Sequence, residues 1–201
     1  MLQTNPAPVS WERMDRSIEK VKERLLRAAA ALRHAGVSYA VVGGNAVAAW
    51  VSRVDEAAVR NTRDVDMLLR REDLVAARQA LEAAGFHYRQ VASLGQGGTM
   101  DIFLDGPDAK VRDAIHILWA GERVKPDSPE PSPDVTSAED AGDFQLITLP
   151  GLVRMKLSSF RDKDRMHLRD LIEVGLVDES WCTTLPAPLT KRLRELLENP
   201  E

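Results

Sequence analysis

The chain has 201 residues, of which 44% are hydrophobic and 29% are charged. These are the proportions and the length of one globular domain with a small helical extension, so a largely disordered chain and two full domains are both excluded. The 27 Lys and Arg residues against 31 Asp and Glu residues give a net charge of -4, which excludes a global basic surface for duplex nucleic acid.

The cellular compartment is indicated by the single cysteine and by the N-terminus. Cys182 has no partner for an intramolecular disulfide, and one thiol is too few for a thiolate-rich zinc site, which favours a reducing compartment. The N-terminus lacks the apolar run of a secretory signal, and no stretch reaches the roughly 18 to 20 uninterrupted apolar residues of a membrane helix. We therefore expect a soluble, cytoplasmic protein with no membrane partner.

The chain begins with a predicted helix, a short strand and a glycine turn. The helix is expected from Ser10 to Gly36, because apolar residues recur there at three- and four-residue spacing. Residues 37–42 are short and β-branched, which predicts a buried strand. This strand runs directly into Gly43-Gly44, and the Ala-rich residues 45–51 predict a short helix after the turn. A polar loop is expected over residues 52–63.

The middle of the chain predicts a mixed sheet flanked by helices, an α/β (α+β) fold. Residues 64–69 alternate charged and apolar side chains and then become fully apolar, as in a strand with one end at a solvent-facing site. An amphipathic helix is expected over residues 72–84. Three further strands are expected over the segments 86–92, 100–104 and 114–119, with turns at 94–98 and 105–107.

The last third of the chain predicts a connector followed by a helical tail. Prolines are spaced too closely between residues 125 and 142 for a helix or a central strand. Helices are expected from Pro150 onward, over 165–174 and over 189–197. The expected organisation is an N-terminal helix (1–36), a core (37–124), a Pro-rich connector (125–148) and a C-terminal helical region (149–201).

Two aspartates on the predicted strand 64–69 form the first candidate site. Side chains alternate faces along a strand, so Asp64 and Asp66 point to the same side with their carboxylates a few ångströms apart. Two like charges this close repel each other unless a cation lies between them or water solvates both. Magnesium suits the pair, because it takes oxygen ligands and is commonly held by one or two carboxylates together with substrate phosphates.

The glycine pair is the second part of that site. Gly43 and Gly44 let the backbone approach a ligand closely, and the start of the following helix presents unpaired N–H groups to an anion. The two features together predict that a divalent metal ion and a triphosphate meet at one place.

The segments GGNA and NTRDVDMLL resemble the signature of the DNA-polymerase-β-like nucleotidyltransferase superfamily. Residues 41–46 and 62–66 are most similar to the AbiEii-type toxin nucleotidyltransferase group, and the similarity extends more loosely through 155–157 and 161–170. The resemblance covers roughly residues 37–176. It implies ATP-binding or other NTP-binding activity, with transfer of a nucleoside monophosphate to an acceptor hydroxyl and help from Mg²⁺ or Mn²⁺. A tRNA, a protein or a small molecule is the implied acceptor, and an antitoxin-like protein is an implied partner.

The resemblance also implies roles for individual residues. Asp64 and Asp66 would bind the metal and act in catalysis, and the nucleotide would contact Gly43, Gly44, Asn45, Thr62, Arg63, Lys156 and Arg161. Simpler interpretations stay open: Asn45 as a helix cap, Thr62 and Arg63 as strand-edge surface residues, and Lys156 as a surface lysine whose stem covers apolar neighbours.

One position departs from the superfamily pattern. A third carboxylate is expected on a later strand, where this chain has His116. A histidine accepts a proton near neutral pH but is a poor magnesium ligand. Asp101 supplies a carboxylate instead if its side chain faces the same side. The alternative function is therefore a catalytically impaired NTP-binding or regulatory module of the same fold, and a further alternative is a protein-interaction unit in which the aspartates are incidental.

Overall fold

The computed structural model describes residues 10–92 and 99–199. Its helices within these ranges are α1 (Trp11–His34), α2 (Gly43–Ser52), α3 (Leu74–Ala83), α4 (Leu149–Ser159), α5 (Asp162–Glu173) and α6 (Ala187–Glu198). Its strands are β1 (Tyr39–Val42), β2 (Val65–Leu69), β3 (His87–Ala92), β4 (Thr99–Leu104), β5 (Ile115–Trp119), β6 (Ala138–Asp140) and β7 (Gln145–Ile147). Short 3₁₀ helices lie at Glu56–Ala58, Arg71–Asp73, Val111–Asp113 and Glu179–Thr183. The glycine-rich turn expected at 94–98 lies outside the described residues.

The strands form one mixed sheet in the order β3-β4-β5-β2-β1-β7-β6. The pairs β2–β5 and β1–β7 are parallel, and the remaining pairs are antiparallel. A parallel pair needs a crossover connection, which β3 and β4 provide between β2 and β5. The expected mixed sheet flanked by helices is confirmed.

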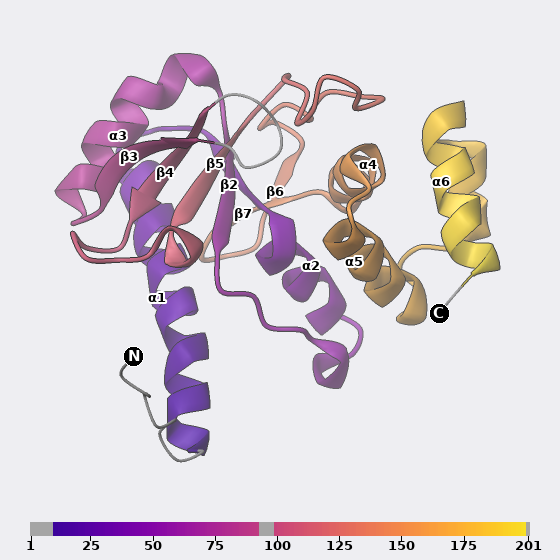
Figure 1. Cartoon of the computed structure of the whole chain (residues 1–201), viewed down its shortest axis with the longest axis horizontal. Helices are drawn as coiled ribbons and strands as arrows, with labels where there is room; N and C mark the ends of the chain where they lie inside the picture. The colour runs from indigo at the N-terminus through magenta and orange to yellow at the C-terminus, as the bar shows by residue number, and fades with distance from the viewer. Residues whose placement is uncertain (1–9, 93–98, 200–201) are drawn as a thin grey trace, which may run out of the picture.

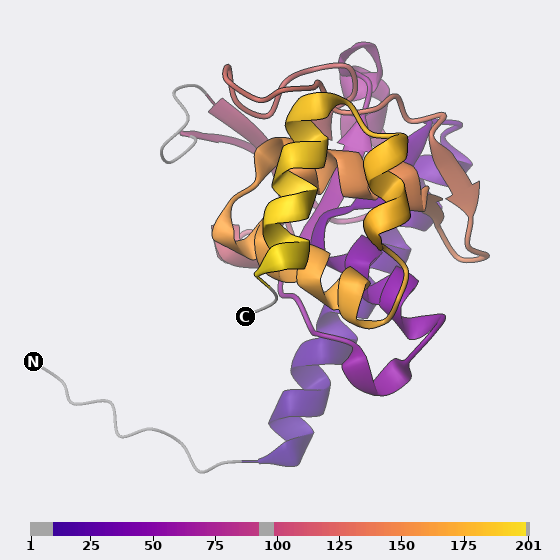
Figure 2. The same ribbon diagram turned by 90° about the vertical axis from the view of Figure 1, so that its right-hand side faces the viewer.

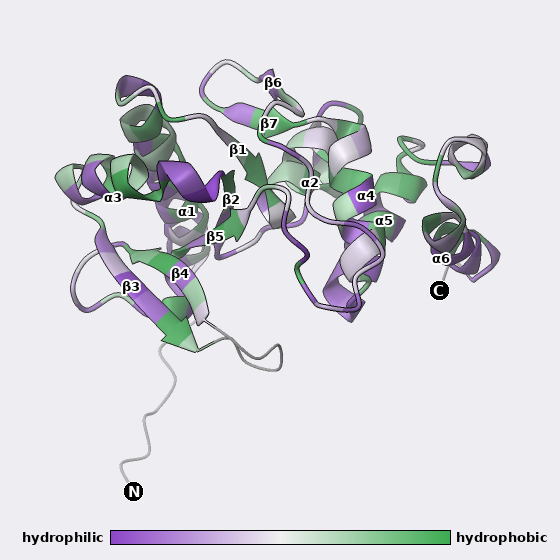
Figure 3. Ribbon diagram, turned by 90° about the horizontal axis from the view of Figure 1, so that it is seen from above, coloured by the Kyte–Doolittle hydropathy of each residue, from purple (hydrophilic) through white to green (hydrophobic). Residues whose placement is uncertain are grey.

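Helices cover both faces of the sheet, so the molecule is layered (Figures 1 and 3). One face packs Val65, Met67 and Ile115 against α1 and α3, and the other packs Val42 and Leu68 against α2, α4 and α5. This division follows from strand geometry, because alternate side chains point to opposite faces. The C-terminal helix α6 lies over α4 and α5 as an outer layer (Figure 2).

The strands β6 and β7 are a difference from the sequence expectation. Residues 125–148 were expected to form a connector only, but β7 pairs with β1 in the sheet and β6 forms its edge. Each strand has three residues, which is too short for a two-residue period to be recognised. The prolines at 126, 129, 131 and 133 do lie outside these strands. The core sheet therefore includes part of the expected connector.

Helix boundaries also differ from expectation by up to three residues, and two of these differences lie at the site. Helix α2 begins at Gly43 rather than after the glycine pair, and α5 begins at Asp162 rather than at residue 165. The described residues include no helix that is both long enough and apolar enough to cross a bilayer.

Candidate functional site

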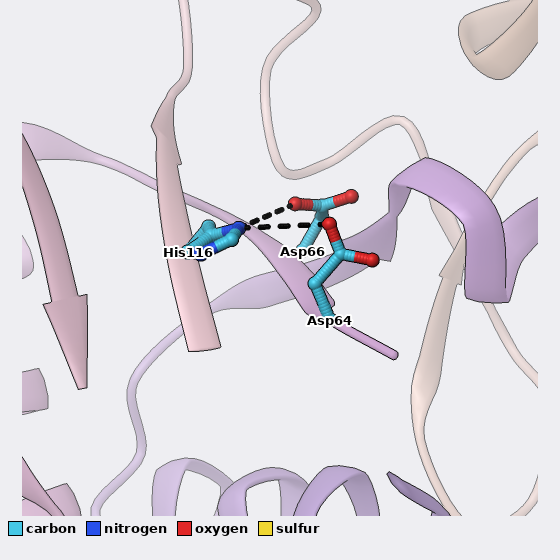
Figure 4. A group of neighbouring side chains, drawn as sticks. All are labelled: Asp64, Asp66 and His116. Carbon is cyan, nitrogen blue, oxygen red and sulfur yellow. Dashed lines mark ion pairs between the residues drawn. The ribbon is translucent and has the colours of Figure 1, made fainter. Parts of the chain in front are cut away.

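The sheet register brings Asp66 and His116 together. Asp66 on β2 lies opposite His116 on the parallel strand β5. Directly paired residues of neighbouring strands point to the same face of a sheet, and here that face is the one covered by α2, α4 and α5. Asp64 directly precedes β2 and joins the same group (Figure 4). Two segments that are distant in sequence thus form one cluster.

The atoms of this cluster lie close enough to share a cation. The Nδ1 atom of His116 is 3.5 Å from Oδ1 of Asp66 and 3.8 Å from Oδ2 of Asp64. One potential ligand atom from each of the three residues lies within 4.8 Å of the others. The three side chains are 15%, 18% and 23% exposed for His116, Asp66 and Asp64 respectively, so the group is shielded and still accessible from solvent.

The surroundings favour the ionised form of Asp64. Burial raises the pKa of this carboxyl, but the hydrogen bond from Thr62, the ammonium of Lys163 and the imidazole of His116 together lower it below its usual value. The hydroxyl of Thr62 donates to Oδ1 of Asp64 at 2.5 Å. Asp64 is therefore a carboxylate at neutral pH.

The imidazole of His116 is oriented by a backbone carbonyl. Its Nε2 atom lies 3.0 Å from the oxygen of Val111, and because a carbonyl only accepts hydrogen bonds, we assign the proton to Nε2. This leaves Nδ1 facing the two carboxylates. Burial lowers the pKa of His116, but the hydrogen bond and charge of Asp66, the Val111 carbonyl and the charge of Asp64 raise it above its usual value.

The glycine bend lies directly against the carboxylates. Gly43 has a φ of +68°, and a Cβ at this position would lie 1.8 Å from Oδ2 of Asp66. At Gly44 a Cβ would lie 3.0 Å from Cβ of Thr62. Both positions therefore exclude larger side chains, Gly43 by conformation and contact and Gly44 by contact alone. The structure brings the bend and both aspartates to one place.

Asn45 and Thr62 hold Asp64 in position. The Nδ2 group of Asn45 donates to the backbone oxygen of Asp64 at 2.8 Å. The N-cap of α2 is Val42, so Asn45 does not cap the helix as its simpler interpretation expected. Arg63 lies on the surface, and its backbone oxygen accepts a hydrogen bond from Arg24.

The segment that joins α4 to α5 places a cationic cluster beside the aspartates. Lys156 is only 7% exposed, so the interpretation of a surface lysine is wrong. Its Nζ lies 3.0 Å from Oδ1 of Asp164, whose Oδ2 accepts from Nε of Arg161 at 2.9 Å and from the hydroxyl of Ser159. The chain turns between the two helices at Phe160, which has a left-handed φ of 50°.

Two cations of this cluster are near the carboxylates. Arg161 is half exposed; burial lowers its pKa, but Asp164, Asp66 and Asp64 outweigh this and raise it. Lys163 lies 3.4 Å from Oδ1 of Asp64. In the sequence, Lys163 belongs to a run of charged residues that is typical of a solvated helix face. Repulsion between the like charges Arg161 and Arg165 is the signal in that run that points to an external anion.

Asp101 does not join the cluster. Its neighbour Ile102 is the residue paired with His116, so Asp101 points to the opposite face of the sheet. There it is 3% exposed and accepts hydrogen bonds from Tyr88 Oη at 2.5 Å and Gln90 Nε2 at 3.3 Å. The condition under which Asp101 could replace the third carboxylate is therefore not met, because strand register turns it away.

Comparisons with known proteins yield similar folds. No protein-family model and no curated protein matches the chain. A crystal structure of an antigenic nucleotidyltransferase-like protein from Paracoccidioides brasiliensis matches with a TM-score of 0.51 and 15% identity, over 92% of this chain and 90% of that chain. The solution structure of the antibiotic-resistance factor ANT(2'')-Ia matches with a TM-score of 0.49 and 15% identity, over 90% and 92% of the two chains.

A crystal structure of ANT(2")-Ia in complex with adenylyl-2"-tobramycin matches with a TM-score of 0.44 and 18% identity, over 90% of this chain and 97% of that one. At these identities a likeness concerns the fold alone. The similarity to the Paracoccidioides brasiliensis protein spans nearly the whole of both chains, and it confirms the nucleotidyltransferase-like fold expected from the motifs.

Proposed function

We propose that this protein is a nucleotidyltransferase that moves a nucleoside monophosphate from an NTP to an acceptor hydroxyl. One observation carries the proposal: the bend at Gly43 is in contact with the carboxylate of Asp66, beside Asp64. Core packing does not require a glycine bend at a helix start to lie beside two carboxylates. Binding of a metal-bound triphosphate does, because the helix start binds phosphate and the carboxylates bind the metal ion.

The residues of the cluster fit a divalent metal ion. Asp64 and Asp66 supply the carboxylate oxygens that Mg²⁺ prefers, and Nδ1 of His116, a poor ligand for magnesium, keeps its lone pair free. We assign the metal to Asp64 and Asp66. When bound, such an ion neutralises charge on the phosphates and favours departure of pyrophosphate.

The triphosphate would be seated by the chain's own groups. Backbone N–H groups at the start of α2, which begins at Gly43, would bind the anion, while Asn45 and Thr62 keep Asp64 in place. Arg161 has a half-exposed guanidinium that interacts electrostatically with both aspartates, and Arg63 is a second candidate on the surface. Lys156 acts through Asp164, to which it is bound, and so positions Arg161 rather than contacting phosphate itself.

The transfer reaction needs a group that accepts the proton of the acceptor hydroxyl. The acceptor oxygen forms a bond to the α-phosphorus, the bond to the bridging oxygen breaks, and pyrophosphate leaves with the electron pair. The hydroxyl proton moves to Nδ1 of His116. Nε2 of the resulting imidazolium still donates to Val111, and the nearby carboxylates stabilise its charge.

Transfer of label tests this function. The protein is incubated with each α-labelled NTP, Mg²⁺ or Mn²⁺, and acceptors from three classes: tRNA, protein, and small molecules that include an aminoglycoside. We expect transfer by the wild type and its loss in Asp64→Asn and Asp66→Asn. Asp108→Asn, which removes an exposed carboxylate of a loop, is the matched control and is expected to retain transfer. Transfer that survives both site substitutions would exclude the assignment.

A toxin-like role is a finer proposal that rests on the AbiEii-type motifs alone. It requires that transfer damages the host and that a neutralising protein partner exists. Induced expression of the wild type would then arrest growth in a bacterial host, whereas Asp64→Asn would not. Equal growth of both strains, at equal protein levels, would remove this role and leave the transferase assignment intact.

A second candidate function is an NTP-binding module without turnover, and His116 in the place of the third carboxylate favours it. It predicts saturable NTP binding by calorimetry with no transferred label for any acceptor. His116→Asp would then supply the carboxylate and create activity. Under the first proposal the same substitution changes an existing rate rather than creating one.

A further inference from the structure

Lys163 contacts a carboxylate that we have assigned to the metal. Its Nζ is 3.4 Å from Oδ1 of Asp64, the oxygen that also accepts from Thr62. An ammonium and a divalent cation at the same carboxylate repel each other, because both are positive and only a few ångströms apart. Lys163 and the metal ion therefore compete for Asp64.

The two lysines of the α4–α5 segment differ in their freedom to move. The side chain of Lys156 is 8% exposed and its partner Asp164 is also held by Arg161, so this lysine is fixed. Lys163 is 46% exposed and is carried by the first turn of α5 on a flexible four-carbon stem. Across residues 10–92 and 99–199, Asp64 is the one ion-pair partner of Lys163. Its contact can be exchanged without breaking another.

A new partner would be close at hand. Arg161 lies two residues before Lys163 and is influenced by both site aspartates, and the Gly43 bend lies against Asp66. A triphosphate bound between this bend and Arg161 would place phosphate oxygens close to Lys163. An ammonium released from Asp64 would find a stronger anion there.

We propose that Lys163 is an exchange cation: it pairs with Asp64 until a divalent metal ion binds, and then transfers to a β- or γ-phosphate oxygen of the NTP. This inference rests on the proposed function, because it requires a triphosphate at the bend. It assigns to Lys163 opposite effects on the two ligands. Lys163 weakens binding of the metal ion alone and strengthens binding of the nucleotide together with the metal ion.

The test measures both affinities in Lys163→Met, which keeps the stem and removes the charge. Mn²⁺ alone is titrated by calorimetry, and a non-hydrolysable α,β-methylene NTP is then titrated at saturating Mn²⁺. Relative to the wild type, we expect Lys163→Met to bind Mn²⁺ about threefold more tightly, which corresponds to the free energy of a partly exposed ion pair. We expect it to bind the analogue about tenfold more weakly. Lys163→Arg keeps the charge and should restore most of the nucleotide affinity.

The control is Lys20→Met, the same charge change on the exposed surface of α1, which should alter neither affinity. Unchanged or weaker Mn²⁺ binding in Lys163→Met overturns the exchange, and so does unchanged binding of the analogue. If the wild type binds no analogue at saturating Mn²⁺, the proposed function fails and the exchange falls with it. If the wild type binds and Lys163→Met binds equally well, only the exchange fails. Melting of each variant by circular dichroism establishes that it is folded.

Discussion

Two glycines with the same backbone conformation, Gly43 and Gly36, differ in how closely they approach other atoms. Gly43 and Gly36 have nearly the same backbone conformation, with φ of +68° and +67°. They differ in their surroundings, because a Cβ at Gly36 meets nothing within 4 Å whereas one at Gly43 meets the Asp66 carboxylate. Alanine substitutions at the two positions therefore distinguish the effect of backbone strain from the effect of contact with the site.

We predict that Gly36→Ala lowers the free energy of unfolding by about 1–2 kcal/mol, the cost of a left-handed alanine, and leaves transfer intact. Gly43→Ala carries the same strain and also displaces Asp66, so it should be destabilised by about 1–3 kcal/mol more and lose transfer. Urea unfolding and label transfer measure the two effects. Equal behaviour of the variants would mean that the bend does not seat the nucleotide.

The hydroxyl of Thr62 offers a second test at this scale. Thr62→Val keeps the shape that packs on Gly44 but removes the hydrogen bond that orients the Asp64 carboxylate, so we expect the affinity of Asp64 for a divalent ion to fall. A hydrogen bond to a charged group contributes about 1.5–3 kcal/mol, so Mn²⁺ should bind roughly tenfold or more weakly in a calorimetric titration. Thr62→Ser retains the hydroxyl and should bind nearly as the wild type does. Equal affinities for valine and serine would contradict this role.

Among the elements, β2 was the most readable from sequence, β4 was expected as a strand but the face of its side chains was not, and β6 and β7 were not expected as strands. A two-residue period is enough to place Asp64 and Asp66 on one face, and a turn followed by a helix is enough to suggest an anion site at Gly43. The face of Asp101 depends on how β4 aligns with β5, and register between distant strands is not written in either segment. Lys163 was overlooked for a similar reason, since only the packing of α5 shows which charges of that helix reach the sheet.

Helix α5 also contains a titratable group that acts on stability. His167 is 5% exposed, and its Nδ1 has no hydrogen-bond partner in the described part of the chain. Burial, with the positive charges of Lys156 and Lys163, lowers its pKa to about 4 despite opposing effects of Asp164 and Asp66. The imidazole is therefore neutral in the folded protein at pH values where an unfolded histidine is protonated.

We predict that the free energy of unfolding falls as pH decreases from about 6.5 to about 4, because the unfolded chain then binds a proton that the folded chain does not. The contribution of one such group is at most about 1.4 kcal/mol per pH unit in this window. His167→Gln should flatten the profile there. The pKa of the ion-paired Asp164 is lowered, so this residue changes the free energy of unfolding only below about pH 4, outside the window used for His167. Urea unfolding at intervals of half a pH unit measures the slope, and an unchanged slope in the variant would contradict the prediction.

For the whole molecule, binding at the site should raise thermal stability. A ligand at a hundredfold its Kd stabilises the folded state by about 2.7 kcal/mol. For a chain of this length that corresponds to a Tm increase of roughly 5–10 °C. We predict such a shift for Mn²⁺ together with a non-hydrolysable NTP, no shift of this size in Asp64→Asn, and a full shift in Asp108→Asn. Lack of any shift in the wild type would favour a protein-interaction unit.

The parallel pairing of β2 with β5 has a consequence for biosynthesis. Asp66 and His116 become neighbours only across that pair, and the chain must complete β3 and β4 before β5 can arrive. A growing polypeptide that has emerged only as far as β4 carries the two aspartates without their imidazole. The proposed site is thus completed late: the imidazole arrives with β5, and Arg161 and Lys163 follow only with the segment that leads into α5.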